Sequence, residues 1–155
     1  MTRGRDYPPD WAVLPGATVS AELTTPGWSQ RPVVEILGNR EGLLSLGSLL
    51  VWVSESAADM ESFSITGLPF VQSRSALSLM VVLSLDPDEP HGQVVRTDKA
   101  QQFEWLVHED LLEHEATGIM HVGFCPDGFC CGHKHGNLGP NSDVELYFDR
   151  TDMKG

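Results

Sequence analysis

The feature that most limits the possible folds of this chain is the alternation of side chains in residues 76–85, ALSLMVVLSL. An apolar residue stands at every second position: Leu77, Leu79, Val81, Leu83 and Leu85. Successive side chains of a β-strand point to opposite faces, so a period of two predicts a strand with one continuous apolar face. Such a face has to be covered by another layer of secondary structure, and the fold therefore needs at least two layers.

Shorter strands are expected on both sides of this segment. Alternating or β-rich runs bounded by turn residues predict strands at 17–23, 32–38, 61–65, 92–97, 118–124 and 144–148. The last of these should point Val144, Leu146 and Phe148 inward. Because strands and helices do not alternate regularly along the chain, the sheet is expected to be mainly antiparallel, with about six strands.

Residues 39–57 have helical spacing instead. The apolar positions that follow this spacing are Leu43, Leu46, Leu50, Val53 and Ala57. Asn39 precedes them as a suitable N-cap. Gly42 and Gly47 each weaken a helix by up to about 1 kcal/mol relative to alanine, yet the stretch is too long for one strand. We predict a helix over residues 40–56.

A second helix is predicted over residues 99–116. Asp98 can cap it, Gln101 stands at the capping-box offset, and Gly118 follows as a stop signal. An apolar stripe at i, i+4 and i+8 supports the helix. The alternative interpretation is a strand through residues 103–107, FEWLV.

The length of 155 residues suits one domain with a single core. Residues 1–16 hold several prolines and glycines and are expected to form an irregular arm. Residues 17–150 should form one α+β domain, in which the sheet packs with the two helices and a Cys/His hairpin lies near the C-terminal end. Residues 151–155 are expected to be a tail.

The net charge is strongly negative, with 22 acidic against 10 basic residues and a formal charge of −12. A chain with this charge repels nucleic acid phosphates and anionic lipid, and attracts basic partners. The longest apolar run, residues 49–53, is far too short to span a bilayer. We therefore expect a basic protein partner, no nucleic acid and no membrane. The simpler alternative is that the charge only maintains solubility.

The acidity is concentrated in residues 86–115, which contain nine acidic residues and only two basic ones. The carboxylates predicted to bind the partner are Asp86, Asp88, Glu89, Glu104, Glu109, Asp110, Glu113 and Glu115. They fall on one loop and on the second predicted helix. The alternative is that they form an ordinary solvated face.

All three cysteines and two of the six histidines lie within residues 125–135, CPDGFCCGHKH. The Pro-Asp-Gly segment predicts a three-residue hairpin loop, with strands on either side. Strand alternation would then gather imidazoles and thiols on one face: His121, Cys125, Cys131, His133 and His135.

This face could bind a metal ion, and zinc is the ion that such ligands suit best. The spacing C-x4-C-C-x-H-x-H lacks the two separated ligand pairs that structural zinc sites usually show. The alternative is therefore a half-exposed hairpin that binds no metal. Cys131 beside His121 or His133 could also act as a thiol–imidazole pair, but no orienting carboxylate or amide can be placed. No catalytic residue is assigned, and an enzyme is not expected.

The start of the chain has no apolar segment typical of a signal peptide. An odd number of cysteines without such a segment favours a reducing compartment. We therefore expect a cytoplasmic protein, in which a Cys125–Cys131 disulfide would be disfavoured despite the proximity of the two residues.

Three segments follow one another in the order GLLSLGSLLVWVSESA, ESFSITGLPF and ALSLMVVLSL. Residues 32–85 resemble small bacterial immunity proteins of polymorphic toxin systems. The shared feature is an apolar helix that precedes paired strands in an acidic single domain. The resemblance carries no functional residues across. It implies that a cognate toxin is bound and blocked in the cytosol. The expected function is an immunity-type inhibitor of a basic toxin or enzyme, and the alternative is a metal-binding protein or small metalloenzyme.

Overall fold

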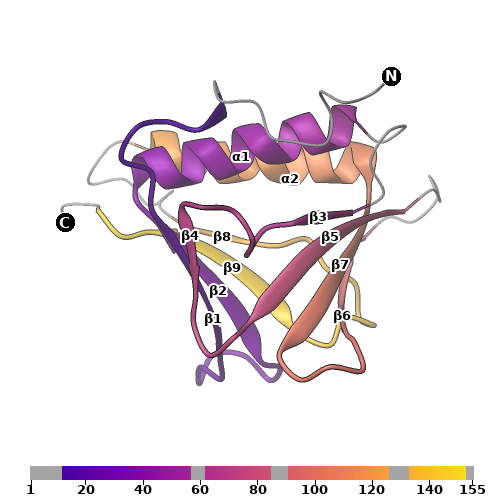
Figure 1. Ribbon diagram of the computed structural model, residues 1–155. Helices are drawn as coiled ribbons and strands as arrows, with labels where there is room; N and C mark the ends of the chain where they lie inside the picture. The colour runs from indigo at the N-terminus through magenta and orange to yellow at the C-terminus, as the bar shows by residue number, and fades with distance from the viewer. Residues whose placement is uncertain (1–11, 57–61, 85–90, 126–132, 153–155) are drawn as a thin grey trace.

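Two β-sheets face each other across the core, and an antiparallel pair of helices lies along one side of both (Figure 1). The computed structural model describes residues 12–56, 62–84, 91–125 and 133–152. In chain order the elements are β1 (Val19–Thr24), β2 (Val33–Gly38), α1 (Arg40–Glu55), β3 (Ser62–Ser64), β4 (Val71–Ser73), β5 (Ser78–Ser84), β6 (Gln93–Arg96), β7 (Gln102–His108), α2 (Glu109–Phe124), β8 (His133–His135) and β9 (Glu145–Arg150). The α+β class and the single domain are confirmed.

Both sheets are mixed rather than mainly antiparallel. Sheet A has the strand order β4-β1-β2-β9-β8, and sheet B has the order β3-β5-β7-β6. Among the described strands, four pairs are antiparallel and three are parallel. Two of the parallel pairs, β2 with β9 and β5 with β7, lie inside the sheets, and the third, β1 with β4, lies at the edge of sheet A.

The chain repeats one arrangement twice. Hairpin β1–β2 leads into α1, and hairpin β6–β7 leads into α2. Strands that follow each helix then pair with the other hairpin: β5 lies parallel to β7, and β9 lies parallel to β2. Each half therefore completes the sheet of the other, and the two halves share one core.

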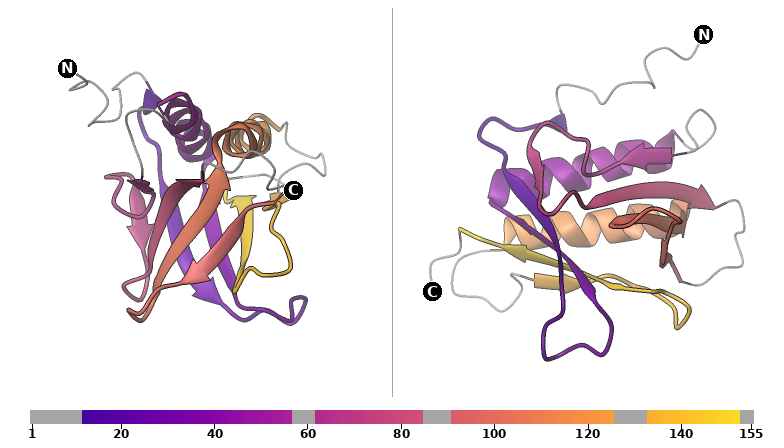
Figure 2. Two further views of the ribbon diagram at one scale, coloured as in Figure 1. Left: turned by 90° about the vertical axis from the view of Figure 1, so that its right-hand side faces the viewer. Right: turned by 60° about the horizontal axis from the view of Figure 1, so that its bottom comes forward.

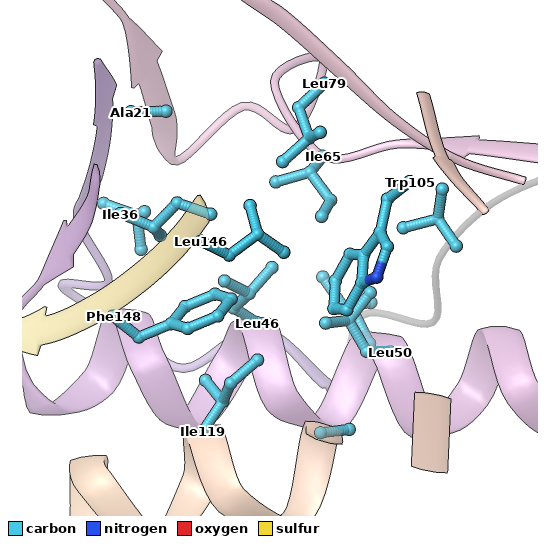
Figure 3. Packing of buried hydrophobic residues seen from close by; sticks show 14 of the residues in the cluster. Ala21, Ile36, Leu46, Leu50, Ile65, Leu79, Trp105, Ile119, Leu146 and Phe148 are labelled. Atoms are coloured by element: carbon cyan, nitrogen blue, oxygen red, sulfur yellow. The ribbon is translucent and has the colours of Figure 1, made fainter. Parts of the chain in front are cut away.

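The core fills the space between the sheets and the helix pair (Figure 3). Ile36 and Phe148 reach it from sheet A, Trp105 from sheet B, Leu46 from α1 and Ile119 from α2, and all five are fully buried. Leu77, Leu79 and Val81 of the strongly alternating segment are also buried, as the period of two predicts.

Helix α1 confirms the first predicted helix and its cap. The Asn39 side chain accepts a hydrogen bond from the Gly42 amide at 2.7 Å. Gly47 lies where α1 meets α2, and a Cβ added there would overlap the Met120 side chain and lie 2.9 Å from the Ala116 carbonyl oxygen. The glycine that weakens the isolated helix therefore permits the close approach of the two helices.

We expect Gly47→Ala to lower the free energy of unfolding by about 1–3 kcal/mol, although alanine is the better helix former. The Met120 side chain can move, but the Ala116 carbonyl is part of the α2 backbone. Urea unfolding followed by circular dichroism measures the change. Gly27→Ala is the matched control, because a Cβ at Gly27 has no atom within 4 Å. Equal stability of both variants would contradict the argument.

The predicted helix over residues 99–116 is confirmed from residue 109 onward and was wrong before it, where the alternative, a strand, forms. The chain forms β7 over Gln102–His108 and begins α2 only at Glu109, with His108 as the N-cap. Phe103, Trp105 and Val107 are buried in alternation, which is the pattern of a strand. Gln101 has a φ of 61°, outside the right-handed helical region, so no helix runs through it.

The predicted strand at 118–124 was also wrong, because these residues form the second half of α2. The buried residues of α2 are spaced by the helical repeat: Leu112, Glu115, Ala116, Ile119, Val122 and Gly123. The predicted hairpin of 118–124 with the residues that follow the loop therefore does not form. His133–His135 instead pairs with β9, and the Pro-Asp-Gly loop lies outside the described residues.

Cys125 caps the C-terminal end of α2 and is disulfide-bonded. A disulfide of Cys125 with Cys131 was expected to be disfavoured, so the presence of a disulfide at Cys125 runs against that expectation. Neither helix in the described part of the chain has the length and apolarity that a membrane span requires.

The predicted N-terminal arm and the predicted C-terminal tail both contact α1 through their described residues. Within the arm, Ala12 is buried and the Leu14 amide donates to Ser45 Oγ at 2.8 Å. Within the tail, Asp152 accepts hydrogen bonds from the Arg40 amide at 3.1 Å and from Arg150 Nε at 2.9 Å. Asp152 therefore adds a carboxylate to the positive end of the α1 dipole.

Asp152→Ala should lower the free energy of unfolding by about 0.5–1 kcal/mol near neutral pH. Partial burial opposes ionisation, but the Arg40 amide and the Arg150 side chain together lower the pKa of Asp152 in the folded state. A lowered pKa gives stability that is present above the ordinary aspartate pKa and is lost as the pH falls through the folded value. Urea unfolding measured from about pH 7 to about pH 3 should therefore show that the difference in the free energy of unfolding between Asp152→Ala and the parent protein becomes smaller as the pH falls.

Candidate functional site

The strongest concentration of chemistry in the described chain lies on the outer face of sheet A. Strand alternation turns Ile36 and Phe148 into the core and their neighbours outward. Figure 2 shows both helices on the core side, so neither covers this face. The outward side chains are Glu22 of β1, Glu35 and Leu37 of β2, Glu145, Tyr147 and Asp149 of β9, and His133 and His135 of β8.

The strand register places these side chains in rows across the sheet. In one row Glu22 pairs with Glu35, Glu35 with Tyr147, and Tyr147 with His135. In the adjacent row Leu37 pairs with Asp149, and Asp149 with His133. Residues that are partners in the register point to the same side, so these are direct neighbours.

Tyr147 lies at the centre of an aromatic group. Its ring centroid is 5.1 Å from that of His135, 5.9 Å from that of His133 and 5.6 Å from that of Trp28. Trp28 comes from the loop between β1 and β2 and is 54% exposed, the largest exposed fraction among the tryptophans that the structure describes. Its indole meets the His135 ring edge-on at 5.3 Å.

These rings surround an open depression of about 510 Å³, which we call the Trp28 pocket. Its lining residues are Trp28, Glu35, Leu37, His133, His135, Tyr147 and Asp149. A second depression of about 530 Å³ shares Trp28 and His135 and extends to Arg31 and Glu145. A third, of about 350 Å³ beside β1 and β4, is lined by no titratable side chain.

The Tyr147 hydroxyl donates a hydrogen bond to Asp149 Oδ2 at 3.1 Å. Burial, this hydrogen bond and the negative charges of Asp149 and Glu35 raise the pKa of Tyr147 to about 12. The phenol therefore stays neutral, and the negative charges of Asp149 and Glu35 add to the larger effect of burial on its pKa. Glu22, Glu35 and Asp149 form no ion pair with any residue in the described part of the chain.

Arg31 fixes the loop that carries Trp28. Its guanidinium donates to Glu145 and to the carbonyl oxygen of Ser142, the latter at 2.7 Å. This arginine ties the loop between β1 and β2 to the segment that leads into β9. The loop that carries Trp28 is therefore held by a charge-assisted contact whose two side chains line the second depression.

The predicted metal ligands are not brought together on one face. His121 is exposed on α2, and only His133 and His135 share a strand. Cys125 is buried and disulfide-bonded, so its sulfur is not a thiolate ligand in this structure, and Cys131 lies outside the described residues. Within the described ranges, no group of three or more His, Cys, Asp or Glu side chains is arranged to hold a metal ion.

The described residues of the predicted acidic region do not lie on one surface. Asp86, Asp88 and Glu89 lie outside the described residues, and Glu104 is on the outer face of sheet B. Glu109 and Asp110 occupy the first turn of α2, where carboxylates stabilise a helix. Glu113 is exposed one turn later on the same helix.

Glu115 belongs to the interior rather than to a binding surface. It is 1% exposed, and it accepts hydrogen bonds from Lys134 Nζ at 2.8 Å and from the Asn137 amide at 2.7 Å. The ion pair joins α2 to β8. Its role is to hold the strand that carries His133 and His135.

Sequence reasoning missed the outer face of sheet A. The inward assignment of Leu146 and Phe148 already implied that Glu145 and Tyr147 point outward. No pattern in the sequence predicted that β9 would pair with β2 and β8.

Comparisons of the chain with protein-family models, with curated proteins and with solved structures found no match. The functional argument therefore depends on the geometry described above.

Proposed function

We propose that this chain is an acidic binding protein of the immunity type, which neutralises a basic toxin or enzyme by covering it with the outer face of sheet A. The observation that carries the proposal is the exposed aromatic group around Tyr147, bordered by carboxylates that form no ion pair within the described residues. It replaces the 86–115 region as the proposed contact surface.

The composition of this face suits a protein interface. Tryptophan and tyrosine are enriched among the residues that dominate binding energy, because they bury a large area with little loss of conformational freedom. Trp28 supplies such a side chain at the rim and Tyr147 supplies one at the centre. An extended, open sheet face also accommodates a protein surface better than a small substrate, which usually needs a more enclosed site.

The charge supports a basic partner. The chain has a net charge of −12, and the face itself carries the carboxylates of Glu22, Glu35 and Asp149, which form no ion pair with a residue that the structure describes. Negative potential of this kind accelerates capture of a positively charged protein and opposes binding to acidic ones. The exposed acids of α2 contribute to the long-range potential without forming part of the contact.

The test is co-expression with candidate basic effector domains, followed by affinity measurement on the purified pair. We expect growth rescue and a complex whose association rate falls as the salt concentration rises from about 50 mM to about 300 mM. Trp28→Ala should weaken the complex, whereas Glu113→Gln on α2 should leave its affinity nearly unchanged. A complex that forms equally well with both variants and at both salt concentrations would contradict the proposal.

The proposed site of action is the cytoplasm, where an incoming effector would be intercepted. The disulfide at Cys125 provides a separate test, because disulfides are rare in that compartment. Cells are lysed in an alkylating agent and the labelled cysteines are identified by mass spectrometry. Cys125 labelled as a free thiol agrees with a cytoplasmic site of action, and Cys125 protected by its disulfide argues against it.

A further inference from the structure

We propose that the Trp28 pocket binds the guanidinium group of one arginine side chain presented by the basic protein partner. This inference rests on the proposed function and specifies the group that the outer face of sheet A recognises. It is carried by aromatic walls, carboxylates that have no ion pair among the described residues, and an apolar lining residue, all in one depression.

The aromatic walls are suited to a cation. Trp28 and Tyr147 are tilted by 53° with centroids 5.6 Å apart, and His135 stands edge-on to Trp28 at 87°. Because the rings are inclined to each other, they line more than one side of the pocket. A cation over the face of tryptophan or tyrosine is attracted by the ring quadrupole, and tryptophan gives the strongest attraction.

The carboxylates lie beside these rings. Glu35 and Asp149 come from adjacent rows of β2 and β9, and both line the pocket. Neither forms an ion pair with a residue that the structure describes. Asp149 accepts hydrogen bonds from the Tyr147 hydroxyl and from the Arg150 amide, one at each oxygen, and each oxygen keeps a further lone pair. The pocket thus offers negative charge and hydrogen-bond acceptors, and its described lining includes no lysine or arginine.

A guanidinium fits this combination better than an ammonium or a metal ion does. It is planar, weakly hydrated and able to stack on a ring while its N–H groups reach carboxylates. Leu37 adds an apolar contact that a strongly hydrated ion would not use. The same chain already places arginines over rings, with Arg96 5.2 Å from the Phe103 centroid and Arg40 5.9 Å from that of Phe124. The described residues contain no cluster that could hold a metal.

The first experiment titrates the full chain with the capped peptide Gly-Arg-Gly and follows the indole N–H signal of Trp28 by NMR. The signal is assigned with the Trp28→Phe variant. We expect saturable movement of this signal, with the indoles of Trp52 and Trp105 unmoved. The same peptide with citrulline, which keeps the shape and loses the charge, should bind at least about tenfold more weakly, and the lysine peptide about threefold more weakly. Equal binding of the arginine and citrulline peptides would overturn the proposal.

The second experiment compares two variants that lose the same charge on the same face. Glu22 and Glu35 are partners in the strand register, but only Glu35 lines the pocket. We expect Glu35→Gln to weaken binding of the arginine peptide about fivefold and Glu22→Gln by less than about twofold. Thermal unfolding confirms that both variants are folded. Equal losses would show that the peptide responds only to the overall charge, and the site would be rejected.

The site and the proposed function fail in different ways. If the chain neutralises a basic partner and Trp28→Ala weakens that complex, but the arginine peptide does not bind and Glu35→Gln leaves the affinity for the partner unchanged, the proposed function stands and the guanidinium site is overturned. If the arginine peptide binds as expected but no basic protein is bound, the proposed function is overturned together with the assignment of the pocket to a partner's side chain.

Discussion

Lys134→Met is expected to lower the free energy of unfolding by about 3 kcal/mol, one of the two largest single effects predicted for this protein. Lys134 Nζ lies 2.8 Å from Glu115 Oε2, and the Glu115 side chain is 1% exposed. Removing the ammonium leaves a carboxylate in the interior with only the Asn137 amide as a described donor. The Lys134 side chain is 19% exposed, so water moderates the cost and we expect the lower part of the usual range for buried pairs.

The double variant Glu115→Leu with Lys134→Met is the control for this prediction. Removing both charges eliminates the uncompensated carboxylate, so stability should recover by about 1–2 kcal/mol relative to Lys134→Met alone. Recovery should be incomplete because the Asn137 amide loses its acceptor. Urea unfolding of the parent, single and double variants gives the coupling directly. A loss below about 1 kcal/mol in the single variant would show that the pair contributes little.

Phe148→Ala and Tyr147→Ala should differ sharply, although the residues are neighbours in β9. Phe148 is fully buried between sheet A and the helices, and its truncation should cost about 3–5 kcal/mol. Tyr147 is half-buried on the outer face, and its truncation should cost less than about 1.5 kcal/mol through the lost contact area and the hydrogen bond to Asp149.

Urea midpoints of the two variants test the assignment of the two faces. If Tyr147→Ala proved as damaging as Phe148→Ala, the outer face of sheet A would be a structural surface rather than one available for binding. The expected difference also makes binding measurements on variants of this face interpretable, because the protein should remain folded.

Sequence periodicity predicted well wherever a single period fitted. Residues 39–57 follow only the helical repeat, and α1 forms there with the expected Asn39 cap. Residues 76–85 follow only the period of two, and β5 forms there with Leu79 and Val81 buried. In both segments the spacing of the apolar residues fits one type of secondary structure and excludes the other.

Residues 99–108 and 118–124 were predicted wrongly because two periods overlap. Phe103 and Val107 are four positions apart, which is an even number and also close to one helical turn, so the pair satisfies a strand and a helix equally. Trp105 alone distinguishes them, since it is buried with its neighbours at i−2 and i+2. Once residues 102–108 form a strand in sheet B, the helix that follows extends through Phe124.

The sequence by itself determined the α+β class, the position of α1, the two-faced strands and the strongly negative charge. Only the tertiary structure decided which outward side chains meet. Glu35 and Tyr147 become neighbours because β9 pairs in parallel with β2, far away along the chain, and β8 adds His133 and His135 beside them. Local periodicity states which way a side chain points but not which strand lies next to it, because pairing of distant strands is chosen by the packing of the whole core.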